Sequence, residues 1–176
     1  MIDTDLIDLY KKESCDRFNE IDNESISKFI DIVFEAYLKE RTIFVAGNGG
    51  TAGYLQNFVV DFNMHPFVAD DKTKPSSVIR NKFKCVNLCA DQATLTGITN
   101  DLGYENVYLE QLKYQLEPED VFIGMSGSGN SQNIVKAMEY CVYSNVKTVL
   151  LTRNLDNNCN KYADLSISLK GKSYFP

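Results

Sequence analysis

The sequence lacks the features that identify membrane, secreted and nucleic-acid-binding proteins. No apolar run approaches the roughly 18 residues needed to cross a bilayer. The segment Met1–Leu9 carries three aspartates, Asp3, Asp5 and Asp8, where a signal peptide has basic residues. With 18 Lys+Arg against 24 Asp+Glu, the net charge is −6, and such a surface repels phosphate backbones. We therefore expect a soluble, cytoplasmic protein that binds neither nucleic acid nor membranes.

The usual cysteine and histidine patterns of metal sites and disulfide frameworks are missing too. The five cysteines are an odd number, include no C-x-x-C pair, and have no histidine close to them; they are Cys15, Cys85, Cys89, Cys141 and Cys159. We expect reduced thiols, packed mostly as small hydrophobic side chains.

What is present predicts one globular domain. Of the 176 residues, 44% are hydrophobic, which is enough for a sizeable core. Helical periodicity is strongest from Ile26 to Leu38, and an earlier helix is indicated from Ile2 to Tyr10. We expect a single domain over residues 1–176, with N-terminal helices in 1–40 and an α/β core in 41–170. The helical pair either supplies a subunit interface or only covers its own core.

From residue 42, short apolar runs alternate with helical stretches. The runs are Thr42–Ala46, Lys84–Cys89, Asp120–Met125, Lys147–Thr152 and Leu165–Leu169, and the helical stretches are 51–64, 92–100, 105–116 and 131–144. This alternation predicts a doubly wound α/β fold with a five-stranded parallel sheet. The polar segment Ala69–Ser77 is the best candidate for a mobile loop.

Two turns that follow predicted strands are rich in glycine and hydroxyl groups. Gly47–Thr51 reads GNGGT and Ser126–Ser131 reads SGSGNS, each just before a helix. Glycine lets backbone N–H groups approach a ligand, and a helix N-terminus favours anions. No Lys follows as in a P-loop, and the dinucleotide spacing is absent. The loops fit a sugar phosphate, while either loop alone could be an ordinary turn between strand and helix.

Three segments resemble the SIS-domain (sugar isomerase) family, and within it the phosphoheptose isomerase branch. Phe44–Ala52 is similar to the G-N-G-G-S-A signature of that branch, Asn100–Tyr104 to N-D-Y-G-[FY], and Ile123–Ser131 to I-G-I-S-T-S-G-N-S. Their order and spacing match, and the resemblance covers roughly residues 20–170. It implies a five-stranded parallel sheet sandwiched by helices, a homotetramer with active sites near subunit interfaces, and a ketose or aldose phosphate as ligand.

The resemblance also assigns site residues by position. The phosphate would be held by Ser126, Gly127, Ser128 and Ser131, and the sugar by Asn48, Gly49, Thr51 and Asn57. Gly127 stands where the family has Thr, and Thr51 where it has Ser. Asp91 stands at the position of an active-site Asp, although it also fits the N-cap of a helix beginning near Gln92.

Catalytic positions depart from the family. Its zinc-binding His and its acid/base Glu are replaced by Asn57 and Asp61, and a last helix bearing Gln and His has no counterpart before Pro176. We therefore expect no metal and no other cofactor, with Asp61 as the remaining base. The Asp61-x-x-x-His65 spacing could pair two ligands, but Pro66 disfavours helical geometry at His65.

Three functional hypotheses remain open. The first is an aldose–ketose isomerase, acting most simply on a heptose 7-phosphate. The second is a non-catalytic phosphosugar-binding regulatory or assembly protein of the same fold, which the replacements at Asn57 and Asp61 favour. The third is that a native last helix is missing from this sequence, which would then be a fragment of an active enzyme.

Overall fold

Five strands form one parallel sheet in the computed structural model, which describes residues 4–68, 72–75 and 81–170. The strands are β1 (Thr42–Gly47), β2 (Lys84–Asn87), β3 (Val121–Met125), β4 (Lys147–Thr152) and β5 (Leu165–Ser168), in the order β2-β1-β3-β4-β5. This confirms the predicted fold class. β2 is shorter than its predicted run because the Asn87 carbonyl accepts a hydrogen bond from the Ala90 N–H, which turns the chain.

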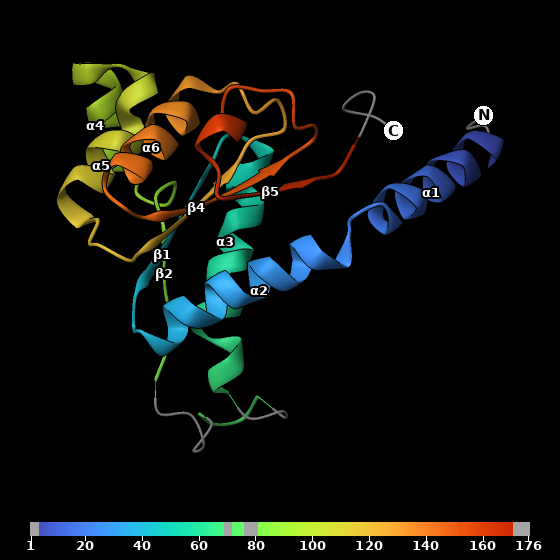
Figure 1. Cartoon of the computed structure of the whole chain (residues 1–176), viewed down its shortest axis with the longest axis horizontal. Coiled ribbons are helices and arrows are strands. Elements are labelled where there is room, and N and C mark those ends of the chain that lie inside the picture. The colour runs from blue at the N-terminus through green and yellow to red at the C-terminus, as the bar shows by residue number, and fades with distance from the viewer. Residues whose placement is uncertain (1–3, 69–71, 76–80, 171–176) are drawn as a thin grey trace.

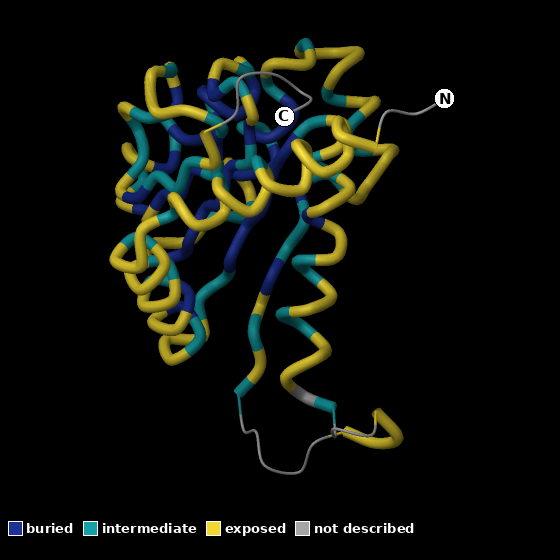
Figure 2. The backbone as a smooth tube through the Cα atoms, turned by 90° about the vertical axis from the view of Figure 1, so that its right-hand side faces the viewer, coloured by how far each residue is buried: buried dark blue, intermediate teal, exposed yellow. Residues whose placement is uncertain are grey.

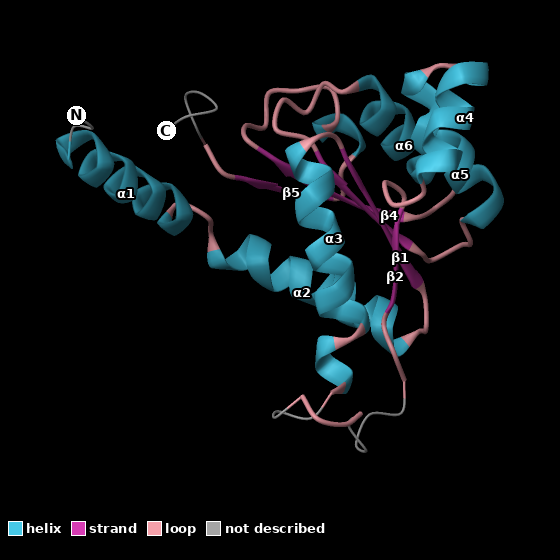
Figure 3. Ribbon diagram, turned by 180° about the vertical axis from the view of Figure 1, so that it is seen from behind, coloured by secondary structure: helices cyan, strands magenta, loops and turns pink. Residues whose placement is uncertain are grey.

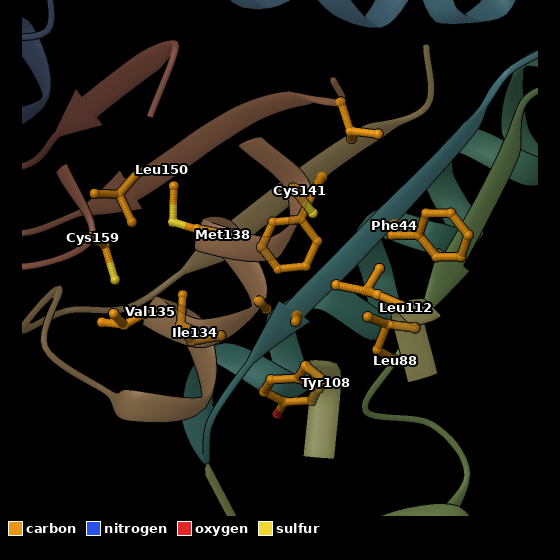
Figure 4. Close-up of a cluster of buried hydrophobic side chains, with 14 of the residues drawn as sticks. Phe44, Leu88, Tyr108, Leu112, Ile134, Val135, Met138, Cys141, Leu150 and Cys159 are labelled. Carbon is orange, nitrogen blue, oxygen red and sulfur yellow. The ribbon is translucent and has the colours of Figure 1, made fainter. Parts of the chain in front are cut away.

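Helices cover both faces of the sheet (Figure 1). One face carries α2 (Asn23–Leu38) and α3 (Gly50–Asn63), and the other carries α4 (Gln92–Leu102), α5 (Val107–Gln115) and α6 (Gln132–Tyr143). Successive β1 residues alternate between the two cores: Ile43 packs with α2 and α3, and Phe44 packs with α5 and α6. Figure 4 shows Ile134, Met138 and Cys141 of α6 within the second core.

The order of the strands creates a crevice between β1 and β3. The chain leaves β1 to add β2 on one side and then returns to add β3 on the other, so the connections diverge over opposite faces. In such sheets ligands bind outside the carboxyl ends of the strands at this switch point. The register pairs Gly47 with Met125, so the turns that follow both residues lie side by side.

The first helix, α1 (Thr4–Asn19), has no buried residue and extends away from the sheet (Figure 3). By contrast, α2 buries Val33 and Ala36 against the sheet. In Figure 2 the buried residues lie mainly in the strands, and the outer helical turns are exposed. Covering the core is therefore a role of α2 and not of α1.

The structure also bears on the predicted loop, on membrane-spanning helices and on the cysteines. The predicted loop Ala69–Ser77 lies mostly outside the described residues, and its described part ends in a bridge between Val68 and Pro75. Within the described part of the chain, no helix is both long and apolar enough to cross a membrane. All five cysteines are free, and burial raises the pKa of Cys85 to about 12.

Asp91 caps α4, which is one of the two roles that the sequence predicted for this residue. Its carboxylate accepts hydrogen bonds from the N–H of Ala93 at 3.0 Å and of Thr94 at 3.3 Å, and from the Thr94 hydroxyl at 2.5 Å. The bond from the Thr94 hydroxyl is the main cause that lowers the pKa of Asp91, followed by the backbone bonds. The cap satisfies two donors at the start of the helix.

We predict that Asp91→Ala lowers the melting temperature at neutral pH. Because the folded-state pKa lies below the ordinary value of 3.8, the stabilisation is present above 3.8 and is lost as pH falls through the folded-state pKa. The difference between variant and wild type should therefore narrow in acid, as followed by circular dichroism. Asp31→Ala, at an exposed position inside α2, is the matched control and should change little. A difference that is independent of pH would contradict the capping role.

Candidate functional site

The loop after β1 is shaped by Thr51 and two glycines. The Thr51 hydroxyl accepts from the Asn48 N–H and donates to the Asn48 carbonyl, both at 2.8 Å. A Cβ on Gly47 would lie 2.6 Å from that hydroxyl oxygen, and Gly49 has a φ of 57°, so both positions require glycine. Gly49 is the N-cap of α3 and provides no side-chain hydrogen bond, which leaves the helix start open to an anion.

The loop after β3 is closed by its first serine. The buried Ser126 hydroxyl accepts from the Gly129 N–H at 3.1 Å and lies 3.3 Å from the Ser131 hydroxyl. Ser131 begins α6 without capping it through its side chain. A Cβ on Gly127 would meet nothing within 4 Å, so the Thr of the family would fit here. This loop therefore presents hydroxyls and N–H groups at the start of α6.

The segment that follows β4 holds the Ser126–Ser131 loop in place. The backbone N–H groups of Cys159 and Arg153 donate to the carbonyls of Gly129 and Gly127, at 2.9 and 3.2 Å. The Asn158 N–H also donates to the Asn130 side chain at 2.9 Å. These bonds join the loop to a neighbouring connection of the sheet and so restrict its conformation.

A pair of asparagines joins the two sides of the crevice. The Asn48 Nδ2 donates to the Asn133 Oδ1 at 3.0 Å, and the Asn133 Nδ2 donates back to the Asn48 Oδ1 at 2.8 Å. The Tyr104 hydroxyl donates to the same Asn48 oxygen at 2.7 Å. The Tyr108 hydroxyl donates to the Gly47 carbonyl, and burial is the main cause that raises its pKa, so the phenol stays protonated. The Asn48 side chain is thus held from several elements.

Two grooves flank the phosphate-loop candidate. One, of about 580 Å³, is lined by Asn48, Tyr104, Glu105, Ser131, Gln132, Asn133 and Lys136. The other, of about 370 Å³ and mostly apolar, is lined by Thr51, Met125, Gly127, Leu151, Thr152, Arg153, Ile167 and Leu169. The structure thus brings Asn48 together with Ser131, and Thr51 together with Gly127.

Sequence reasoning missed five residues of the larger groove: Tyr104, Glu105, Gln132, Asn133 and Lys136. Tyr104 ends the quoted Asn100–Tyr104 segment, which was a usable signal. Lys136 follows Gln132 by four residues and so shares a face of α6 with it. That spacing could have extended the site from the loop into the helix. The Lys136 Nζ lies 3.7 Å from the Glu105 carboxylate and donates to Asn106 at 3.0 Å.

Six predicted site residues line neither groove. Gly49, Ser126 and Ser128 belong to the two glycine-rich loops themselves, whereas the other three lie outside those loops. Asn57 and Asp61 are exposed on α3, and Asp61 is ten residues beyond Thr51, about 15 Å at the rise of an α-helix. Asp61 pairs with His65, with 2.8 Å between its Oδ1 and the His65 Nδ1. As Pro66 predicted, α3 ends before His65, at Asn63. Asp91 is the N-cap of α4.

The residues present do not fit the zinc site that the family resemblance implies. Asn57 offers an amide where the family has an imidazole, and Asp61 with His65 supplies two ligands where zinc sites use three or four. Over residues 4–68, 72–75 and 81–170, no three His, Cys, Asp or Glu side chains gather in a cluster that could hold a metal ion. The side chains that line the larger groove offer hydroxyls, amides, the Glu105 carboxylate and the Lys136 ammonium.

Comparison with known proteins relates the chain to one family. A model of the SIS domain matches residues 10–153. Phosphoheptose isomerase 2 of Campylobacter jejuni is 34% identical over 137 residues, which are 78% of this chain and 63% of that protein. The phosphoheptose isomerase of Helicobacter pylori strain P12 is 31% identical over 159 residues, 90% of this chain and 78% of the relative. The chain thus spans less than two thirds of the length of the first relative and about three quarters of the second.

Solved structures support the same fold. A phosphoheptose isomerase from Francisella tularensis superimposes with a TM-score of 0.81 at 17% identity, covering 97% of this chain and 85% of that one. The phosphoheptose isomerase of Neisseria gonorrhoeae gives 0.80 at 19% identity, with 96% and 84% covered. Together with the matched residues, these similarities show that the chain belongs to the SIS-domain family and is related to its phosphoheptose isomerases.

Proposed function

We propose that residues 1–176 form a single SIS domain that binds a sugar phosphate and interconverts its aldose and ketose forms, with a heptose 7-phosphate as substrate. The observation that carries this proposal is the placement of two glycine-rich loops side by side at the switch point, each at the start of a helix. The relationship to phosphoheptose isomerases supports the same reaction.

The phosphate is assigned to the loop after β3. Ser128 and Ser131 donate their hydroxyls, and the backbone at Gly127 and the start of α6 supplies N–H groups. Ser126, which is buried, holds the loop closed through Gly129. The sugar then lies over the loop after β1, within reach of Asn48, Gly49 and Thr51.

The reaction requires that a proton move between neighbouring carbons through an enediol. A base must remove that proton, and donors must stabilise the charge that develops on oxygen. We assign Asp61 as the base, supported by its bond with His65, and Asn48 and Thr51 as groups that face the sugar. Asn57 shares a helix face with Asp61 and is assigned to the sugar. Asp91, which follows β2, is the second carboxylate that we assign to the reaction.

The position of Asp61 favours a site shared between copies of the chain. It lies about 15 Å further along α3 than Thr51, beyond the loops of its own chain. Exposed apolar side chains on α1 and α2 offer a surface for association: Leu6, Leu9, Tyr10 and Phe18 on α1, and Ile26, Ile30, Phe34 and Leu38 on α2. We propose a homo-oligomer, a tetramer, in which Asp61 of one copy serves the loops of another.

A second candidate function is phosphosugar binding without catalysis, in a regulatory or assembly protein. It is favoured by one observation: the side chains at the family's catalytic positions, Asn57 and Asp61, lie outside both grooves that flank the loops. Both candidate functions use the same phosphate loop, so they differ in whether the bound sugar phosphate is isomerised.

Incubation with sedoheptulose 7-phosphate, followed by NMR, tests the isomerase proposal. We expect new aldose signals with and without added zinc, and a rate at least about 10²-fold lower in Asp61→Asn, because the variant lacks the base. Asp31→Asn is the matched control for an exposed helical aspartate and should retain the wild-type rate. Binding without turnover in the wild-type protein would instead establish the second candidate.

Ser128→Ala tests the phosphate loop. Loss of one hydroxyl that donates to a charged ligand should weaken phosphosugar binding about tenfold, measured by calorimetry. Ser144→Ala, at the opposite end of α6, removes the same group outside the site and should bind like the wild type. If Ser128→Ala and Ser144→Ala bound the phosphosugar equally well, Ser128 would not be a phosphate ligand.

Light scattering tests the oligomer. The wild-type protein should be a tetramer at micromolar concentration, and Leu9→Glu should shift it toward smaller species, since a charge on the exposed apolar side of α1 disfavours burial. Asp8→Glu changes the neighbouring position without changing charge and should leave the assembly intact. A monomeric wild-type protein would contradict the shared site.

A further inference from the structure

We propose that Asn133 and Tyr104 are positioning residues that turn Asn48 into a pure hydrogen-bond donor toward a substrate oxygen. This inference rests on the proposed function, because it concerns how the same site meets the sugar. Neither residue belongs to the glycine-rich loops, and they approach Asn48 from α6 and from the 3-10 turn Tyr104–Asn106.

The acceptor capacity of the Asn48 carbonyl oxygen is filled by the protein. An amide oxygen has two lone pairs, and this one accepts from the Asn133 Nδ2 at 2.8 Å and the Tyr104 hydroxyl at 2.7 Å. Tyr108 adds no donor, although its hydroxyl lies 3.2 Å away, because its proton goes to the Gly47 carbonyl. A sugar hydroxyl therefore finds no acceptor at this atom.

The orientation of both amides follows from a backbone donor. The Ile134 N–H lies 3.0 Å from one terminal atom of the Asn133 side chain. A backbone N–H can only donate, so that atom is the oxygen. The other end of Asn133 is then its NH₂ group, which faces Asn48, and the atom it meets there is the Asn48 oxygen. Asn133 is only 2% exposed, so water does not compete for these bonds.

One N–H of Asn48 remains for the ligand. Of the two hydrogens on its Nδ2, one is used by the Asn133 Oδ1 at 3.0 Å. Asn48 lines the larger groove together with Ser131, so the acceptor proposed for the remaining N–H is a ligand oxygen in that groove. A donor fixed before the ligand binds suits a carbonyl or enediolate oxygen, where negative charge grows during the reaction. Asn48 therefore selects for an acceptor oxygen on the substrate.

Tyr104→Phe is the main test, because it removes only the hydroxyl and keeps the ring of a half-exposed side chain. Calorimetry should show sedoheptulose 7-phosphate binding about tenfold more weakly, with inorganic phosphate binding unchanged, since the phosphate loop is intact. The same substitution made in Asn48→Ala should cause no further loss, because Tyr104 acts through that amide. Asn133→Leu should give the same pattern as Tyr104→Phe.

Two controls separate positioning from general destabilisation. Tyr162→Phe removes a tyrosine hydroxyl that bonds to Glu139 of α6 away from the grooves, and it should leave both affinities unchanged. Gln111→Leu removes a buried amide bonded to the carbonyls of Leu88 and Val107, and it should lower stability without changing affinity. Gln111→Leu is the comparison for Asn133→Leu, whose amide is equally buried.

The outcomes distinguish failure of the positioning role from failure of the proposed function. The positioning role would be overturned if Tyr104→Phe bound sedoheptulose 7-phosphate with wild-type affinity. It would also be overturned if Tyr104→Phe weakened this binding equally in the wild-type and Asn48→Ala backgrounds. Either result would leave the phosphosugar site in place. A wild-type protein that binds no phosphosugar would overturn the proposed function and the inference together. The role would be established if Tyr104→Phe weakened binding of the sugar phosphate but not of inorganic phosphate, and had no effect in the Asn48→Ala background.

Discussion

The parallel pairing of β1 with β3 is the constraint on which the site depends. The loop after β1 leads into α3 on one face of the sheet, and the loop after β3 leads into α6 on the other face. The two loops therefore diverge, while their first residues stay neighbours. This geometry creates the crevice and directs two helix N-termini toward it. A site for an anion follows from backbone arrangement before any side chain is considered.

Side chains in the crevice divide into those that hold its shape and those left for a ligand. Ser126 and Asn133 form their hydrogen bonds with the protein, and both are almost fully buried. Such buried polar groups are stabilising only when satisfied, because an unpaired one costs about 1–3 kcal/mol. The Ser128 hydroxyl accepts from the Asn130 N–H at 3.2 Å, which leaves its own proton for the phosphate in the proposed site.

The carboxylate proposed as the base lies away from the two loops. Asp61 sits near the end of α3 beside His65, and the helix carries it away from the loops rather than toward them. A single chain thus separates the proposed phosphate loop from the proposed base. The exposed apolar residues of α1, which bury nothing within their own chain, give a physical reason for association that would bring the two parts together.

The sequence by itself determined the elements and their order. Helical periodicity from Ile26 to Leu38, the short apolar runs and the glycine-rich turns are local signals, and they predicted the α/β fold and both loops. Pro66 predicted the end of α3, and the cap at Asp91 was one of two alternatives for that residue. Only the tertiary structure decided which helix leaves the body and which distant residues meet. Asn48 and Asn133 lie 85 positions apart, and Asn48 and Tyr104 lie 56 apart. Such contacts depend on strand order and helix packing, which no local periodicity encodes, so the amide pair that orients Asn48 appears only once the sheet is assembled.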